Sequence, residues 1–245
     1  MQKLSFISPG NPVRAWSRRI VRGNRRNRPD VQLLQMKRRI GLLEDFVDLK
    51  AHSRGWIDTL IACLTPLQFA EMPLVRMGSR HDGGYVLPAA LSQMVSGVVS
   101  IGVGDNNTVD RQLATAGLRV HAWDHTVAGL PSRHENIVFH QVGLGDSMSN
   151  PALRSLAEIC DDSFGRGSGH LLLLLDAEGA EWTEIAAASE DTLARFDVIG
   201  IEMHDLGDLI LDPSRQLPSL TKLHRMFVRV AVHATNHPAS GDFQD

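Results

Sequence analysis

The chain has few cysteines and no long apolar segment, and each absence excludes a class of protein. Two cysteines in 245 residues are too few for a disulfide framework, so we expect Cys63 and Cys160 to pack as small apolar residues. No stretch approaches the roughly 20 apolar residues of a membrane span, and no apolar h-region near the N-terminus marks a secretory signal. These features predict a cytoplasmic protein without a transmembrane segment.

Acidic residues are nearly missing from the first 40 positions. Asp30 is the one acid there, against eleven basic residues: Lys3, Arg14, Arg18, Arg19, Arg22, Arg25, Arg26, Arg28, Lys37, Arg38 and Arg39. The segment carries +10, which leaves −13 for the other 205 residues of a chain whose net charge is −3. A basic arm on an acidic body favours an anionic partner for residues 1–30, and a solvated tail is the alternative.

Composition and periodicity divide the chain into three parts. Residues 1–30 hold scattered prolines and no apolar period, so we predict a basic, disordered arm. Residues 31–71 are predicted to form N-terminal helices, one with an apolar seam and one over 56–70. The seam either docks on the body of a monomer or pairs in a homodimer through 33–47; it consists of Leu33, Met36, Ile40, Leu43 and Val47. Residues 72–245 are expected to form the main domain.

Apolar runs alternate with helical patterns from position 72 onward. Two short strands around Asp82-Gly83-Gly84 predict a hairpin. Further strands are predicted at 97–102, 119–123, 136–142, 170–175, 197–202 and 227–233, and helices at 108–116, 150–160, 180–194 and 216–225. Alternation of this kind predicts an α/β fold with a doubly wound, mostly parallel, Rossmann-like sheet and an N-terminal helical extension.

Glycines or carboxylates follow three of the predicted strands. Gly102 and Gly104 end the first, Asp124 follows the second and Asp176 the fourth. Ligands of open α/β sheets bind beyond the carboxyl ends of the strands, so these ends outline a cofactor crevice. The dinucleotide fingerprint is incomplete, because Asn107 stands where its third glycine is expected.

The charges around this crevice discriminate between cofactors. Asp124 can accept both hydrogen bonds of a ribose diol, and Trp123 either covers an adenine or packs in the core. Asp105 and Asp176 would repel a pyrophosphate but suit a cation. S-adenosylmethionine carries a ribose, a sulfonium and an ammonium group, and it is therefore favoured over NAD.

Several motifs together resemble the FkbM-type, class I S-adenosylmethionine-dependent methyltransferases over about residues 72–237. The motifs are Asp82-Gly-Gly-Tyr-Val-Leu, Gly102-Val-Gly-Asp-Asn, Asp124-His-Thr, Asp176-Ala-Glu-Gly-Ala-Glu-Trp, Ile201-Glu-Met-His and Val232-His-Ala-Thr-Asn. The resemblance implies a seven-stranded sheet, methyl transfer usually to oxygen, and cofactor contacts at Gly102, Gly104 and Asp124. In that fold the last strand inserts antiparallel between strands five and six. Little sequence follows position 237 to form it, so either the domain is truncated or its sheet is closed differently.

Histidines and acids at the strand ends are the candidates for the chemistry. His204, directly after the fifth strand, is the expected general base, with Asp176 as its catalytic neighbour. The alternative is a histidine satisfied by Asp205 or Glu202. We expect Tyr85, Glu178 and His233 to contact the acceptor. Asp176, Glu202 and His204 could hold a divalent cation, but no ligand-spacing motif supports this and we predict no metal.

The leading hypothesis is O-methylation of a small-molecule or glycan acceptor, namely a hydroxyl on a saccharide, a glycan or a secondary metabolite. One alternative is methylation of RNA guided by the basic arm; against it, the main domain is acidic. A second is a non-catalytic, nucleoside-binding scaffold with the same fold. A third, an NAD-linked oxidoreductase, is disfavoured by Asp105 and Asn107.

Overall fold

The computed structural model describes residues 2–7, 53–67, 72–80, 83–206, 208 and 212–234. Its main feature is a mixed sheet of seven strands: β1 (Gln2–Ile7), β4 (Gly97–Ile101), β5 (Arg119–Trp123), β6 (Ile137–His140), β9 (Leu171–Leu175), β10 (Phe196–Met203) and β11 (Val228–Ala234). The spatial order is β11-β1-β10-β9-β4-β5-β6. Strands β10, β9, β4, β5 and β6 pair in parallel, as in the predicted α/β fold.

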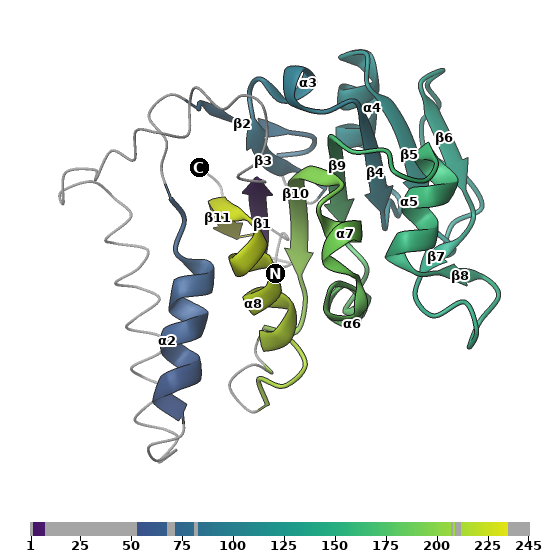
Figure 1. Cartoon of the computed structure of the whole chain (residues 1–245). Coiled ribbons are helices and arrows are strands. Elements are labelled where there is room, and N and C mark those ends of the chain that lie inside the picture. The colour runs from purple at the N-terminus through teal and green to yellow at the C-terminus, as the bar shows by residue number, and fades with distance from the viewer. Residues whose placement is uncertain are drawn as a thin grey trace, which may run out of the picture.

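Helices and a hairpin cover the two faces of this sheet (Figure 1). One face packs against α2 (Ser53–Leu64), α5 (Leu156–Phe164), α6 (Ala180–Ala187) and α8 (Leu217–Met226); the other packs against α3 (Leu91–Met94), α4 (Thr108–Thr115) and strand β3 (Tyr85–Pro88) of the hairpin with β2 (Leu74–Met77). Strand β9 shows the division, since Leu171, Leu173 and Leu175 join one core cluster and Leu172 and Leu174 the other. Three short elements complete the fold: α7 (Glu190–Leu193), β7 (Gly143–Leu144) and β8 (Leu153–Arg154).

The first strand of the chain lies inside the sheet. β1 pairs antiparallel with β10 on one side and with β11 on the other, and Figure 1 shows it between them. The prediction that residues 1–30 are disordered is therefore wrong for residues 2–7. β1 lies between β10 and β11, which are the fifth and sixth parallel strands in chain order. In the expected arrangement this place belongs to the last strand of the domain, so the sheet is closed differently here.

Several predicted elements have different bounds in the structure. The helix predicted at 150–160 begins instead at Leu156, because Ser155 and Glu158 form a capping box there. The helix predicted at 180–194 is divided into α6 and α7, because Ser189 caps a new helix by accepting a hydrogen bond from the Thr192 amide. The predicted hairpin is confirmed by the antiparallel pairing of β2 with β3. The predicted helix with the 33–47 seam lies outside the described residues.

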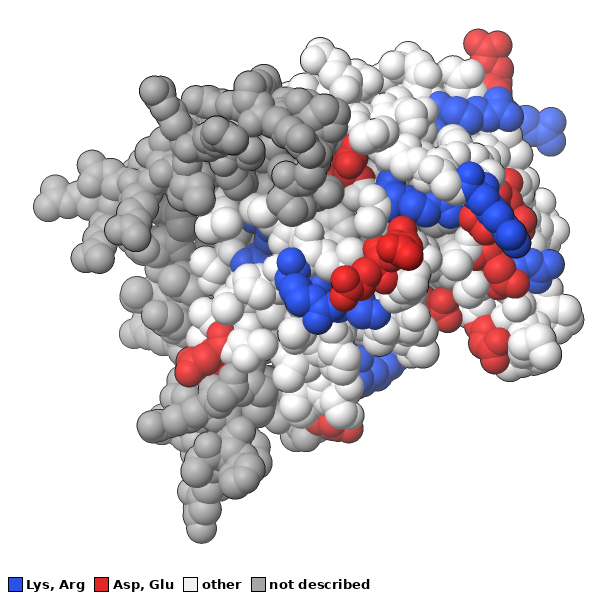
Figure 2. All heavy atoms as spheres, viewed as in Figure 1, with Lys and Arg blue, Asp and Glu red and all other residues white. Residues whose placement is uncertain are grey.

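Charged side chains are mixed on the visible face of the molecule. Figure 2 shows Lys and Arg of the described residues interspersed with Asp and Glu rather than gathered into one basic stripe. Exposed pairs such as Arg215 with Asp205 and Arg225 with Glu190 illustrate this mixing. None of the described helices has the length and apolar character needed to cross a bilayer. Residues 8–30, which hold most of the basic arm, lie outside the described residues.

Candidate functional site

A cavity of about 400 Å³ opens at the carboxyl ends of β4, β5 and β9. It is lined by the segments that follow these strands, including residues 102–106, 124–126 and 176–178. The chain leaves β4 toward β5 on one side, while β9 lies on the other side of β4. A switch point of this kind is where open α/β sheets bind ligands. The structure thus brings the three predicted strand ends together around one cavity.

The two glycines after β4 have different roles. Gly102 has φ +81°, and a Cβ atom there would lie 1.4 Å from the carbonyl oxygen of Asp176, so this position needs glycine to let two loops meet. Gly104 has φ +55°, borders the cavity, and would place a Cβ in open space. The backbone at Gly104 is therefore open to a ligand, as predicted from the Gly-x-Gly motif.

The Asp124 carboxylate is held firmly on the β5 side of the cavity. Its Oδ2 accepts a hydrogen bond from the Gly104 amide at 2.7 Å, and its Oδ1 accepts from the amide and hydroxyl of Thr126 at 2.7 and 2.6 Å. Burial opposes ionisation, but these hydrogen bonds outweigh it and lower the pKa of Asp124. A carboxylate has about four lone-pair positions, so about one remains to accept a bond from a ligand hydroxyl, rather than the two of the prediction.

Trp123 borders the cavity, but its indole belongs to the core. The ring stacks on His140 with a centroid distance of 3.9 Å. Its Nε1 donates to the hydroxyl of Ser163 at 3.0 Å, and only 2% of the residue is exposed. The structure thus favours the core alternative over an adenine platform.

A buried chain of charged groups lies on the β9 and β10 side. Lys3 lies on β1, and its ammonium group pairs with the Glu202 carboxylate at 2.7 Å; both side chains are buried. Burial, together with the negative charge and the hydrogen bond of Glu202, raises the pKa of Asp176 to about 8. At neutral pH Asp176 therefore holds a proton beside the Lys3–Glu202 ion pair.

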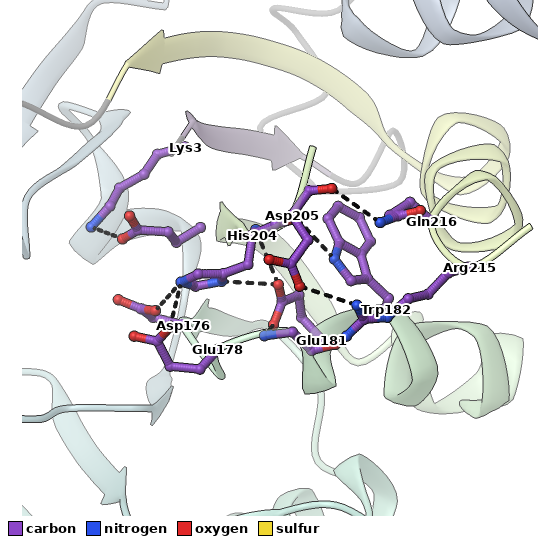
Figure 3. Close-up of polar contacts among 11 residues, drawn as sticks. Lys3, Asp176, Glu178, Glu181, Trp182, His204, Asp205, Arg215 and Gln216 are labelled. Carbon is purple, nitrogen blue, oxygen red and sulfur yellow. Dashed lines mark hydrogen bonds and ion pairs between the residues drawn. The ribbon is translucent and has the colours of Figure 1, made fainter. Parts of the chain in front are cut away.

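His204 lies behind the cavity lining and not in it. Its Nδ1 is 3.0 Å from Oε1 of Glu181, while its Nε2 lies 3.3 Å from Oε2 of Glu178 and 3.5 Å from Oδ1 of Asp176 (Figure 3). Burial alone would lower the pKa of the imidazole, but the hydrogen bond with Glu181 and the three carboxylate charges raise it to about 9. The prediction of a general base at His204 is therefore not supported, because the ring is protonated at neutral pH and only 4% exposed.

Glu181 was not among the predicted site residues, although it fixes the geometry of His204. Its Oε1 accepts from the backbone amide and from Nδ1 of His204, and its Oε2 accepts from the Gly179 amide at 2.8 Å. Trp182 adds a bond from its Nε1 to the His204 carbonyl at 3.1 Å. The third acid of the Asp176-Ala-Glu-Gly-Ala-Glu-Trp motif, in the first turn of α6, was the signal that could have identified it.

The three predicted acceptor residues are placed differently. Tyr85 and Glu178 line the cavity, and the Glu178 side chain is 79% exposed. His233 does not line it: it lies on β11, paired with Lys3 of β1, so β1 separates it from β10. The structure therefore does not bring His233 to this cavity.

Asp110 is a second functional candidate that the sequence analysis missed. It lies in the first turn of α4, borders the cavity and is 1% exposed. Its Oδ1 has no hydrogen-bond partner among the described residues. Burial raises the pKa of Asp110 to about 6, although a hydrogen bond with Ser100 acts in the opposite direction. A buried carboxylate facing a cavity without a partner on one oxygen is suited to a cationic ligand group.

The cavity as a whole is acidic. Five carboxylates line it, and no lysine or arginine of the described residues does; the acids are Asp105, Asp110, Asp124, Asp176 and Glu178. Such a lining attracts cations and repels phosphates. Comparisons of the chain with protein families, curated proteins and solved structures found no match.

Proposed function

We propose that this chain is an S-adenosylmethionine-dependent methyltransferase that acts on a hydroxyl of a saccharide, a glycan or a secondary metabolite. The observation that carries the proposal is the carboxylate-lined cavity at the switch point of the sheet. A dinucleotide cofactor would bring a pyrophosphate into a lining with five acids and no described lysine or arginine. A sulfonium and an ammonium group fit this lining.

The sheet supports the same proposal. Class I methyltransferases carry an antiparallel strand between the fifth and sixth parallel strands. In this chain β1 holds that position, antiparallel to β10 and β11. The resemblance of the motifs to FkbM-type methyltransferases points to the same class. β1 thus occupies the position that this antiparallel strand has in the class.

The residues present fit the cofactor. The open face of Gly104 leaves room for a ligand against the backbone, and Asp124 retains capacity for one ribose hydroxyl. Asp105 and the unpartnered Oδ1 of Asp110 offer negative charge to an ammonium or sulfonium group. Bound S-adenosylmethionine would supply a methyl group that an acceptor oxygen displaces from sulfur in line.

Asp176 is better placed than His204 to take the proton of the acceptor. It borders the cavity, whereas His204 is behind it. As the acceptor oxygen gains the methyl group, its proton passes to Asp176 in the fraction of the protein in which this carboxyl is ionised; because its pKa is about 8, turnover should rise as the pH approaches that value. His204 then acts as a positioning residue, since its Nε2 lies 3.5 Å from Asp176 and its Nδ1 is fixed by Glu181.

Calorimetric titration with S-adenosylmethionine, S-adenosylhomocysteine and NAD tests the proposal. We expect the first two to bind and NAD not to bind. Gly104→Ala should weaken binding at least about tenfold, because its methyl group would occupy cavity space. Gly117→Ala is the matched control: Gly117 also has a positive φ, +91°, and open space at its Cβ, but lies outside the cavity lining. Both variants should lose a similar stability, about 1–2 kcal/mol.

The outcomes separate the candidate functions. Tight NAD binding, or no binding of S-adenosylmethionine by folded protein, would overturn the proposal. Binding of both adenosyl ligands with no turnover on a panel of hydroxylated acceptors would favour the nucleoside-binding scaffold. Equal loss of affinity in the Gly104 and Gly117 variants would show that the cavity is not the binding site.

A further inference from the structure

We propose that Asp176, Glu178 and His204 bind a divalent cation of the Mn²⁺ or Mg²⁺ class at the edge of the carboxylate-lined cavity. One ring nitrogen and two carboxylate oxygens of these residues lie within 4.8 Å of one another. Figure 3 shows both carboxylates facing the same nitrogen of the ring. The site is distinct from the cofactor contacts at Gly104, Asp110 and Asp124.

The distances match coordination. The Nε2 atom of His204 lies 3.3 Å from the Glu178 oxygen and 3.5 Å from the Asp176 oxygen. An ion about 2.1 Å from each donor separates neighbouring donors by about 3.0–3.4 Å, for octahedral or tetrahedral geometry. Two of the three donor separations therefore match coordination, and the third, between the two carboxylate oxygens, is within 4.8 Å and can be adjusted by the exposed Glu178 side chain.

The His204 ring is oriented as a ligand. Nε2 is buried and has no hydrogen-bond partner of good geometry among the described residues, although it points at two carboxylates. Nδ1 donates to Oε1 of Glu181 at 3.0 Å, and this carboxylate is itself held by the Gly179 amide. Metal-bound histidines almost always donate their other ring N–H to such a group, which fixes the tautomer and the ring plane.

The ligand set differs from the one considered from the sequence. Glu202 pairs with Lys3, so its charge is compensated and Glu178 takes its place beside Asp176 and His204. Two carboxylates and one imidazole on the edge of a cavity suit Mn²⁺ or Mg²⁺, which accept oxygen ligands and keep positions for water or substrate. The ion and the proton of the acceptor hydroxyl would both need the carboxylate of Asp176. Binding of the ion would release the protons of Asp176 and of Nε2 of His204 to solvent. The ion would then lower the pKa of an acceptor hydroxyl bound to it, and the proton of that hydroxyl would pass to water rather than to Asp176.

Titration of the full chain with Mn²⁺ alone, followed by electron paramagnetic resonance and calorimetry, tests the site. We expect saturable binding of one ion, and selective paramagnetic broadening of the His204 ring signals in an NMR spectrum. Glu178→Gln should weaken binding at least about tenfold; because this side chain is exposed, the variant should fold. His204→Gln and Glu181→Gln should also weaken binding, and circular dichroism would show whether each is folded.

Asp105→Asn is the matched control, since Asp105 is an acid of the same cavity outside the ligand set. This variant should change Mn²⁺ affinity less than about threefold. The inference is overturned if no saturable binding occurs, if the Asp105 and Glu178 variants weaken binding equally, or if the His204 signals are not broadened. None of these readouts uses S-adenosylmethionine, so failure of the metal site is distinguishable from failure of the proposed methyl transfer.

Discussion

The two sides of the cavity share a sequence signature, an acidic residue directly after a buried strand, yet their carboxylates are in opposite states. Asp124 after β5 accepts three hydrogen bonds, and its pKa is lowered. Asp176 after β9 faces the buried Glu202, and its pKa is raised to about 8. Hydrogen-bond donors surround the first carboxylate, whereas the second is buried beside another acid. The β5 side is therefore a rigid support, and the β9 side is a cluster of acids that holds protons at neutral pH, which a metal ion would replace.

The largest expected effect comes from removing the buried ammonium group of Lys3 on the β9 side. Lys3→Met keeps the length of the side chain but leaves Glu202 and Asp176 without the ammonium group. Removal of one partner of a buried ion pair destabilises by about 3–5 kcal/mol. Urea denaturation at pH 7 would measure the change in the free energy of unfolding.

The double variant Lys3→Met/Glu202→Gln is the control for this effect. It removes both charges of the buried pair and should recover most of the lost stability. A loss below about 1 kcal/mol in Lys3→Met alone would contradict the placement of β1 beside β10.

β1 is also the strand of the seven-stranded sheet that the sequence analysis missed. Leu4 and Phe6 alternate with the buried polar residues Lys3 and Ser5, a period of two that predicts a strand. This signal covers only six residues, and the prolines and arginines that follow it indicated a disordered arm. The partners of β1 start almost 200 positions later, and no local pattern reveals a pairing over that distance.

The central parallel strands were easier to predict, because β4, β9 and β10 are buried along their whole length and are therefore largely apolar. β9 is five leucines, and its position was predicted within one residue. The strand ends also predicted which loops would surround the cavity. The state of each side chain could not be predicted, because it depends on contacts between elements. His204 illustrates this, since Glu181 on α6 decides its protonation.

The second prediction concerns the β5 side. Asp124→Ala leaves the Gly104 amide and both Thr126 donors without their acceptor, and it should reduce the free energy of unfolding by about 3 kcal/mol at pH 7. Because the folded pKa of Asp124 is lowered from 3.8, its contribution is present above pH 3.8 and is lost as the pH falls through the folded pKa. The difference between variant and wild type should therefore shrink in acid.

Thermal unfolding at pH 7 and pH 3 would measure this difference. Asp146→Ala is the comparison, because Asp146 also accepts a bond from an amide two residues later, that of Met148, but is exposed. We expect a loss of only about 0.5 kcal/mol for this variant. Equal losses at Asp124 and Asp146 would show that Asp124 is not a buried support.

The smallest expected effect has the opposite sign and concerns Asp110, on α4 between the two sides. Its folded pKa is about 6, against 3.8 for the ordinary group. The folded state therefore holds a proton that the unfolded state releases between these values, and stability falls as the pH rises through this window. Asp110→Asn removes the burial of a charge and should raise the free energy of unfolding by about 1–2 kcal/mol at pH 8, with the gain disappearing near pH 4.

The same variant should lower the affinity for S-adenosylmethionine, and this pairing of effects distinguishes the site from a merely structural acid. Ser100→Ala offers the complementary variant, because loss of its hydrogen bond should raise the pKa of Asp110 further and steepen the pH dependence of unfolding. If Asp110→Asn gained stability and kept its affinity, the unpartnered Oδ1 would have no role in binding. A gain accompanied by weaker binding would mean that the chain keeps a destabilising carboxylate for its charge. We expect the carboxylates of Asp176 and Glu178 on the β9 side to be kept in the same way, for the binding of a metal ion.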